Sequence, residues 1–116
     1  IMHMCGWSGE PNQIKLWQDY PVKVVNWAVF VENMTLEQGR KFFDGRTCLG
    51  GYETHWDGRI QQGIIYHGTK EELQEYTREL ILNHGKLGLM LGGDCTIDAK
   101  IDWERLRWIV EAARSL

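Results

Sequence analysis

The chain has 116 residues, of which 43% are hydrophobic and 25% are charged, a composition typical of one folded globular domain. Its formal charge of -3 leaves no basic stripe that would neutralise phosphates, which argues against nucleic acid as a partner. No stretch reaches the roughly 18 apolar residues of a membrane span. The first residues do not combine a basic segment with a long apolar one, so a cytoplasmic protein and no membrane partner are expected.

Four short apolar segments, rich in β-branched residues or glycine, have the pattern of β-strands. They cover residues 1–5, 22–27, 47–51 and 87–93. A helix is expected after each strand, over residues 12–19, 35–43, 69–84 and 103–114. Strands that alternate with helices predict an α/β fold with a parallel sheet, and the apolar run 87–91 predicts a strand covered on both faces.

Local signals support the expected helices. Thr35 with Gln38, and Thr69 with Glu72, have the spacing of capping boxes, and Gly85 has the position of a C-terminal cap. Two stripes at helical spacing are expected to be buried. The first is Leu73, Tyr76, Leu80 and Ile81; the second is Leu106, Ile109, Val110 and Ala113, with Glu104, Arg105, Arg107 and Glu111 towards solvent.

Two thiols and an imidazole follow strand ends. His3 and Cys5 are two residues apart, so both side chains leave the same face of the first strand, and Cys95 follows the last strand. If the strands belong to one barrel, all three project at its C-terminal mouth. They form a zinc set that leaves a fourth position open, as in catalytic zinc sites. From spacing alone, buried thiols and a core histidine are the simpler interpretation, and Cys48, in mid-strand, keeps it.

The segment His3-Met4-Cys5-Gly6 resembles the His-x-Cys-Gly element of corrinoid-dependent methyltransferases in the uroporphyrinogen decarboxylase superfamily. Residues 92–97 resemble the glycine-rich segment that brings their second cysteine. Weaker similarity extends along nearly the whole chain, at residues 20–27, 48–51, 63–69 and 103–114. The resemblance implies that residues 1–116 are the C-terminal half of a TIM (β/α)8 barrel, about four βα units, and that the N-terminal half is absent. It also implies that His3, Cys5 and Cys95 bind zinc.

The resemblance further implies methyl transfer between a corrinoid, such as methylcobalamin, and a thiol or another methyl donor or acceptor. The corrinoid would be free or carried on a partner protein. In the decarboxylases of the superfamily a histidine usually stands where Cys95 stands, and the His-x-Cys pair is absent. A tetrapyrrole decarboxylase, or an inactive fragment of either enzyme, stays open as the alternative. Half a barrel leaves two unpaired edges, so self-association or dependence on the missing half is expected.

Other polar residues near the expected mouth carry weaker hypotheses. Glu53 and His55 follow the third strand, within the long polar connection 52–68, and are candidates for substrate contact or proton transfer. An exposed loop pair is the competing interpretation. Asp94 is a candidate hydrogen-bond acceptor for a ligand imidazole, and Asn26 either points into the cavity or ends its strand.

Overall fold

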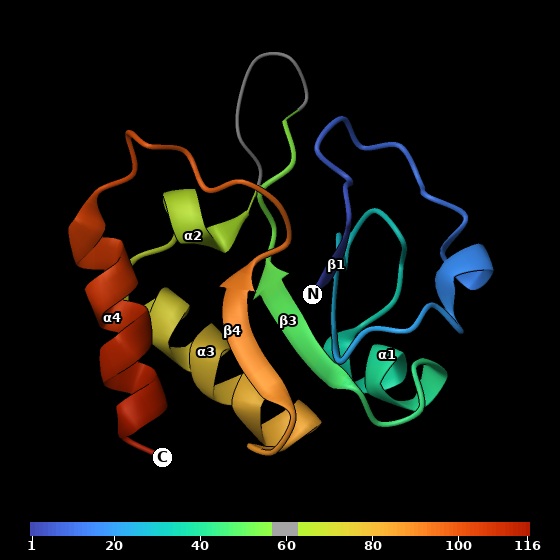
Figure 1. The fold of residues 1–116 in the computed structure, drawn as a ribbon. Helices are drawn as coiled ribbons and strands as arrows, with labels where there is room; N and C mark the ends of the chain where they lie inside the picture. The colour runs from blue at the N-terminus through green and yellow to red at the C-terminus, as the bar shows by residue number, and fades with distance from the viewer. Residues whose placement is uncertain (57–62) are drawn as a thin grey trace.

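A four-stranded, all-parallel sheet organises the chain (Figure 1). The computed structural model describes residues 1–56 and 63–116. The strands lie in sequence order, β1 (Met2–Met4), β2 (Val24–Trp27), β3 (Thr47–Tyr52) and β4 (Leu89–Gly93), and each pairs in parallel with the next. The predicted α/β class and parallel sheet are therefore confirmed, and residues 57–62 of the expected 52–68 connection lie outside the described residues.

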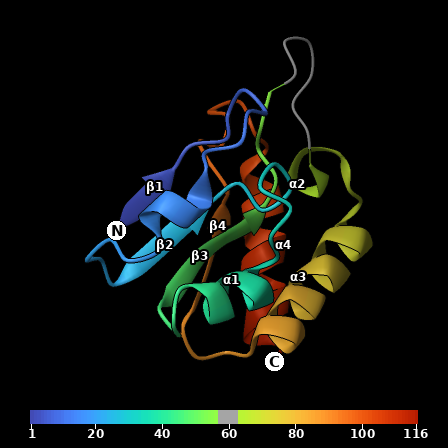
Figure 2. The same cartoon turned by 90° about the vertical axis from the view of Figure 1, so that its right-hand side faces the viewer.

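Among the described residues, four α-helices accompany the sheet: α1 (Leu36–Phe42), α2 (Ile64–His67), α3 (Lys70–His84) and α4 (Trp103–Arg114). The helices α1, α3 and α4 lie on one side of the sheet, as the two perpendicular views agree (Figures 1 and 2). The molecule measures 37 × 36 × 20 Å. Its short dimension reflects one layer of helices on one layer of strands, so the other sheet face has no covering layer among the described residues.

The core lies between the sheet and these helices. One cluster is built around side chains that are buried completely, Val25, Trp27 and Cys48, and a second around Tyr52 and Leu73. Val25 and Cys48 pair in register across β2 and β3, so they face the helices together. Cys48 is thus a small core hydrophobe, as its mid-strand position predicted.

The local helix signals are confirmed. Thr35 and Thr69 each accept a hydrogen bond from the backbone of the residue three positions on, and the side chains of Gln38 and Glu72 bond back. Both predicted capping boxes are therefore complete. Gly85 ends α3 with a φ of +88° and donates its N–H to the carbonyl of Ile81 over 2.8 Å.

The first predicted helix is wrong. Residues 12–19 hold only a 3-10 turn, η1 (Ile14–Trp17). Gln13 precedes the turn in the left-handed conformation and provides no side-chain cap, and Ile14 is its only buried residue. A segment with one buried side chain and no cap lacks the packing that stabilises most short helices.

Two predictions of burial are also wrong. Strand β4 is not covered on both faces, because no layer among the described residues covers the sheet face that carries Met90: this residue is 45% exposed, and Leu87, which precedes the strand, is 80% exposed. On α4 the residues that are buried differ from the stripe that the sequence predicted. Val110 is exposed and Ala112 is buried, while Arg105 points inward and donates to the carbonyl oxygens of residues 65 and 68.

No helix in the described ranges 1–56 and 63–116 is long and apolar enough to cross a membrane.

Candidate metal centre

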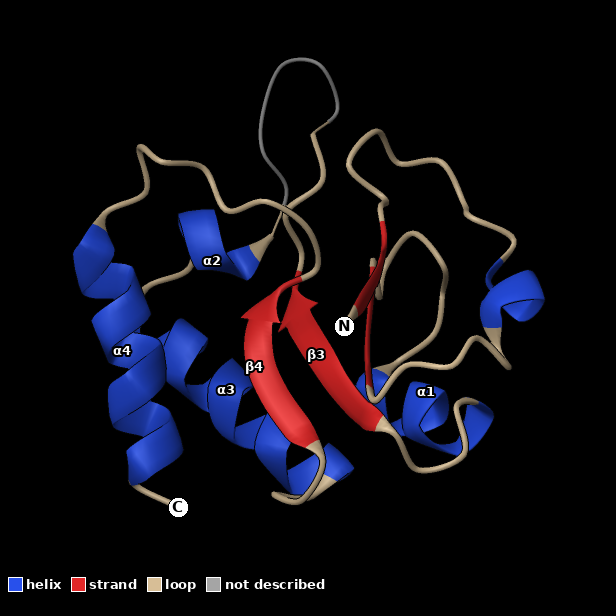
Figure 3. Ribbon diagram, viewed as in Figure 1, coloured by secondary structure: helices blue, strands red, loops and turns tan. Residues whose placement is uncertain are grey.

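The loops that follow the strands gather at one end of the sheet (Figure 3). There one ring nitrogen of His3 and the sulfur atoms of Cys5 and Cys95 all lie within 4.8 Å of one another. The two sulfur atoms are 3.5 Å apart although the residues are separated by 90 positions in the chain. The structure therefore brings together the three residues that the sequence proposed as metal ligands.

The geometry of the cluster fits a tetrahedral zinc ion. Zinc bonds to sulfur at about 2.3 Å, so two thiolates of a tetrahedral site lie about 3.8 Å apart. The observed separation of 3.5 Å between the Cys5 and Cys95 sulfurs is close to that value, and both residues are free cysteines. One imidazole and two thiolates are ligands that zinc prefers, and they leave a fourth position for a substrate atom.

Exposure distinguishes these residues from core residues. His3 and Cys5 are exposed and Cys95 is half-buried, whereas Cys48 is completely buried. Within the described residues, His3 and Cys5 thus lack the burial that the interpretation as a core histidine and a packed thiol requires. That interpretation holds for Cys48, whose pKa is raised to about 11 by burial despite the lowering effect of the Arg40 charge.

Asn26 connects His3, the first candidate ligand, to the rest of the sheet. Its side-chain oxygen bonds Nδ1 of His3. Its amide nitrogen donates to the carbonyl oxygens of Leu49, over 2.8 Å, and of Gly93, over 3.3 Å. The side chain is 5% exposed, so this amide lies within the sheet end and reaches all three other strands.

Asp94 does not bond a ligand imidazole. Its two carboxylate oxygens accept the backbone N–H groups of Val29, at 2.9 Å, and of Gly51, at 2.8 Å. Burial raises the pKa of this carboxyl to about 7, against the lowering effect of those two hydrogen bonds and with a further rise from the Glu53 charge. Asp94 therefore fastens the loop that carries Cys95 to β3 and to the segment after β2.

Thr54 holds Cys95 itself. Its hydroxyl oxygen accepts the backbone N–H of Cys95 over 2.9 Å, and its side chain is completely buried. Partial burial raises the pKa of the Cys95 thiol, and the neighbouring Cys5 raises it further. A bound divalent cation would reverse this preference, because it stabilises the thiolate directly.

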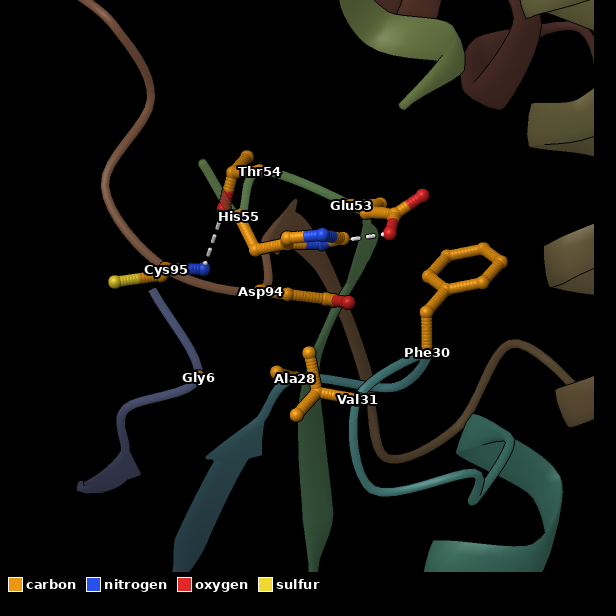
Figure 4. Close-up of a pocket in the computed structure, with 9 residues that line it drawn as sticks. All are labelled: Gly6, Ala28, Phe30, Val31, Glu53, Thr54, His55, Asp94 and Cys95. Carbon is orange, nitrogen blue, oxygen red and sulfur yellow. Dashed lines mark hydrogen bonds and ion pairs between the residues drawn. The ribbon is translucent and has the colours of Figure 1, made fainter. Parts of the chain in front are cut away.

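A narrow crevice adjoins the centre (Figure 4). Nδ1 of His55 lies 2.7 Å from a carboxylate oxygen of Glu53, and both side chains are about four-fifths buried. Figure 4 shows the imidazole turned toward that carboxylate, with Asp94 and Cys95 beside the pair. Glu53 and His55 are thus a largely buried acid–imidazole pair and not an exposed loop pair. The lining residues are Gly6, Ala28, Phe30, Val31, Glu53, Thr54, His55, Asp94 and Cys95.

Sequence patterns missed the roles of three residues. Nothing local to Thr54 marks it as the partner of Cys95, and nothing local to Asn26 or Asp94 identifies which groups their side chains bond. All of these contacts join positions more than 20 residues apart. No family model matches the chain, and neither does any curated protein or solved structure.

Proposed function

We propose that the chain is the zinc-binding half of a methyltransferase that moves a methyl group between a corrinoid and a thiol. One observation carries the proposal: His3, Cys5 and Cys95 converge in a zinc-like geometry at the carboxyl ends of parallel strands. Active sites of parallel α/β folds lie at that end of the sheet. The resemblance of residues 3–6 and 92–97 to zinc-dependent corrinoid methyltransferases supplies the reaction class.

A zinc ion held by these residues would act as a Lewis acid and would lower the pKa of a substrate thiol. The chain's own part is to orient the ligands and to leave one coordination position open. In the proposed transfer a substrate thiol would lose its proton and form a new S–C bond to the methyl group, and the methyl-corrinoid substrate would release that group with the electron pair of the Co–C bond left on cobalt. The His55 imidazole, paired with Glu53 beside the centre, is the candidate acceptor for the thiol proton.

The barrel is part of the proposal. Within the described residues β1 and β4 each have one neighbour, and the sheet face away from the helices carries His3, Leu49 and Met90. A closed TIM barrel would cover that face and pair both edges. The N-terminal half of the barrel, on the same or another polypeptide, is the proposed partner, and a corrinoid protein is the second.

The experiment that tests this function is metal analysis joined to a methyl-transfer assay. The purified protein should contain one equivalent of zinc, and Cys95→Ser should lose most of it. With the N-terminal half supplied, the unsubstituted protein should methylate a thiol from methylcobalamin and Cys95→Ser should not. The matched control is Cys48→Ala, which removes a core thiol and should keep both properties.

Stoichiometric zinc and full methyl transfer in both Cys5→Ser and Cys95→Ser would contradict the proposal. A protein that binds no zinc would instead favour a decarboxylase-type relative or a non-catalytic fragment.

A further inference from the structure

We infer that Asn26 is a positioning residue that holds His3 in a single tautomer, with its Nε2 lone pair directed to the metal. The inference rests on the proposed zinc site and deepens it. It follows from the hydrogen bonds of one buried amide and from the register of two neighbouring strands.

The register explains why the two side chains meet. His3 and Asn26 are directly paired partners on β1 and β2, so their side chains leave the same face of the sheet side by side. Leu49 is the paired partner of Asn26 on β3. His3, Asn26 and Leu49 lie on the sheet face away from the helices, where His3 is exposed and Asn26 is buried between its two neighbours.

The orientation of the amide follows from its partners. The NH2 group of Asn26 faces two carbonyl oxygens, of Leu49 and of Gly93, and a carbonyl oxygen can only accept a hydrogen bond. Turning the amide by 180° would place its oxygen against both carbonyls and leave the NH2 group on His3. The oxygen of Asn26 must therefore face His3, where it is an acceptor.

An acceptor at Nδ1 determines the state of the imidazole. Since the amide oxygen only accepts, Nδ1 of His3 must carry the proton and donate it. In the neutral ring Nε2 then has a free lone pair, which is the form that a metal requires. Asn26 thus selects the metal-binding tautomer before any metal arrives.

The amide is itself well supported. Asn26 is 5% exposed, so rotation of its side chain would leave the amide and its partners without hydrogen bonds and out of reach of water. Gly50 makes room for it: a Cβ at this position would lie 3.4 Å from the Asn26 amide nitrogen and 3.0 Å from a carboxylate oxygen of Asp94. The backbone of Gly50 also has a φ of +143°, which other residues rarely adopt.

The direct test is NMR of the metal-free protein, with the ring nitrogens of His3 observed through long-range couplings to its carbon-bound protons. At a pH where the ring is neutral, the expected result is protonated Nδ1 and unprotonated Nε2. A His3 ring protonated at Nε2 would overturn the inference, and this measurement needs no variant.

Variants extend the test to the metal. Asn26→Leu removes the acceptor and should weaken zinc binding about tenfold to a hundredfold, the range for loss of a group that orients a ligand histidine. Asn26→Asp keeps an acceptor for Nδ1 and should therefore keep the Nδ1–H tautomer, but it should lower the free energy of unfolding, because its second carboxylate oxygen would face the carbonyl oxygens of Leu49 and Gly93. The stability control is Thr77→Val, which breaks a buried hydrogen bond to Tyr52 between α3 and β3, contacts none of the three proposed ligands and should leave zinc affinity unchanged.

Unchanged zinc affinity in a folded Asn26→Leu protein would also overturn the inference. If Asn26→Leu does not fold, the tautomer of His3 in the unsubstituted protein decides. Failure of the proposed function would give a different result. Methyl transfer would then be absent, while His3 would still be protonated at Nδ1 and Asn26→Leu would still bind zinc more weakly than the unsubstituted protein.

Discussion

Zinc should stabilise the fold by a measurable amount, because its ligands come from opposite ends of the chain. Cys5 follows β1 and Cys95 follows β4, 90 positions apart, and the unfolded chain does not hold them together. An ion that binds only the folded state at a hundred times its Kd adds about 2.7 kcal/mol to the free energy of unfolding. For a chain of this length 1 kcal/mol raises Tm by about 4 °C, so zinc should raise Tm by about 10 °C.

The measurement is differential scanning calorimetry over a series of buffered free zinc concentrations. In Cys95→Ser the loss of one thiolate should weaken binding by at least a hundredfold. The same zinc concentration then equals Kd at best and contributes about 0.4 kcal/mol, or about 2 °C. Cys48→Ala lowers the starting Tm by creating a cavity in the core, but its zinc-dependent rise should stay near 10 °C.

Two results would refute the reasoning. One is the same zinc-dependent rise in Cys95→Ser as in the unsubstituted protein, since the bound zinc would then not depend on the proposed ligand. The other is no rise at any concentration of zinc below the onset of precipitation.

Four further predictions follow from the structure. His55→Gln in the complete barrel should keep one equivalent of zinc but slow thiol methylation about tenfold to a hundredfold or more, because it removes the proposed proton acceptor. An unchanged methylation rate would exclude that role for His55. At pH 8 and without zinc, iodoacetamide should modify Cys5 but spare Cys48, because the raised pKa of about 11 leaves only about one Cys48 side chain in a thousand as the reactive thiolate. Mass spectrometry of the peptides measures both sites, and equal labelling would contradict the buried position of Cys48. In an exposed helix a Gly→Ala substitution stabilises the fold by about 1 kcal/mol. Gly39→Ala should instead lower the free energy of unfolding in urea by about 1 to 2 kcal/mol, because the new Cβ would lie 2.1 Å from the buried Trp27 ring, and a stabilised variant would contradict this packing. The free edges of β1 and β4 should make the isolated chain self-associate, so sedimentation of a stable monomer at micromolar concentration would count against the half-barrel.

The local parts of the structure were predictable from the sequence. Both capping boxes, the span of α4 and the four strands follow from residues that lie within a few positions of one another. Such signals depend on backbone hydrogen bonds and side-chain periodicity that neighbouring residues determine. The three proposed metal ligands were also identified by type and by their places at strand ends.

Other features depended on tertiary contacts. The segment 12–19 was expected to be a helix because it follows a strand, but it has too little buried surface, so only a 3-10 turn forms. Met90 and Val110 are apolar yet exposed, because no layer among the described residues covers the sheet face or the helix face on which they lie.

The candidate metal centre shows the same division between local and tertiary determinants. Residue types and strand ends indicated His3, Cys5 and Cys95, but only the parallel pairing of four strands brought Cys95 to within 3.5 Å of Cys5. The partner of the His3 ring is Asn26, not Asp94, because strand register places His3 and Asn26 side by side while backbone N–H groups take both oxygens of Asp94. Sequence spacing describes neighbours along the chain, whereas these bonds join groups that become neighbours only when the sheet has formed.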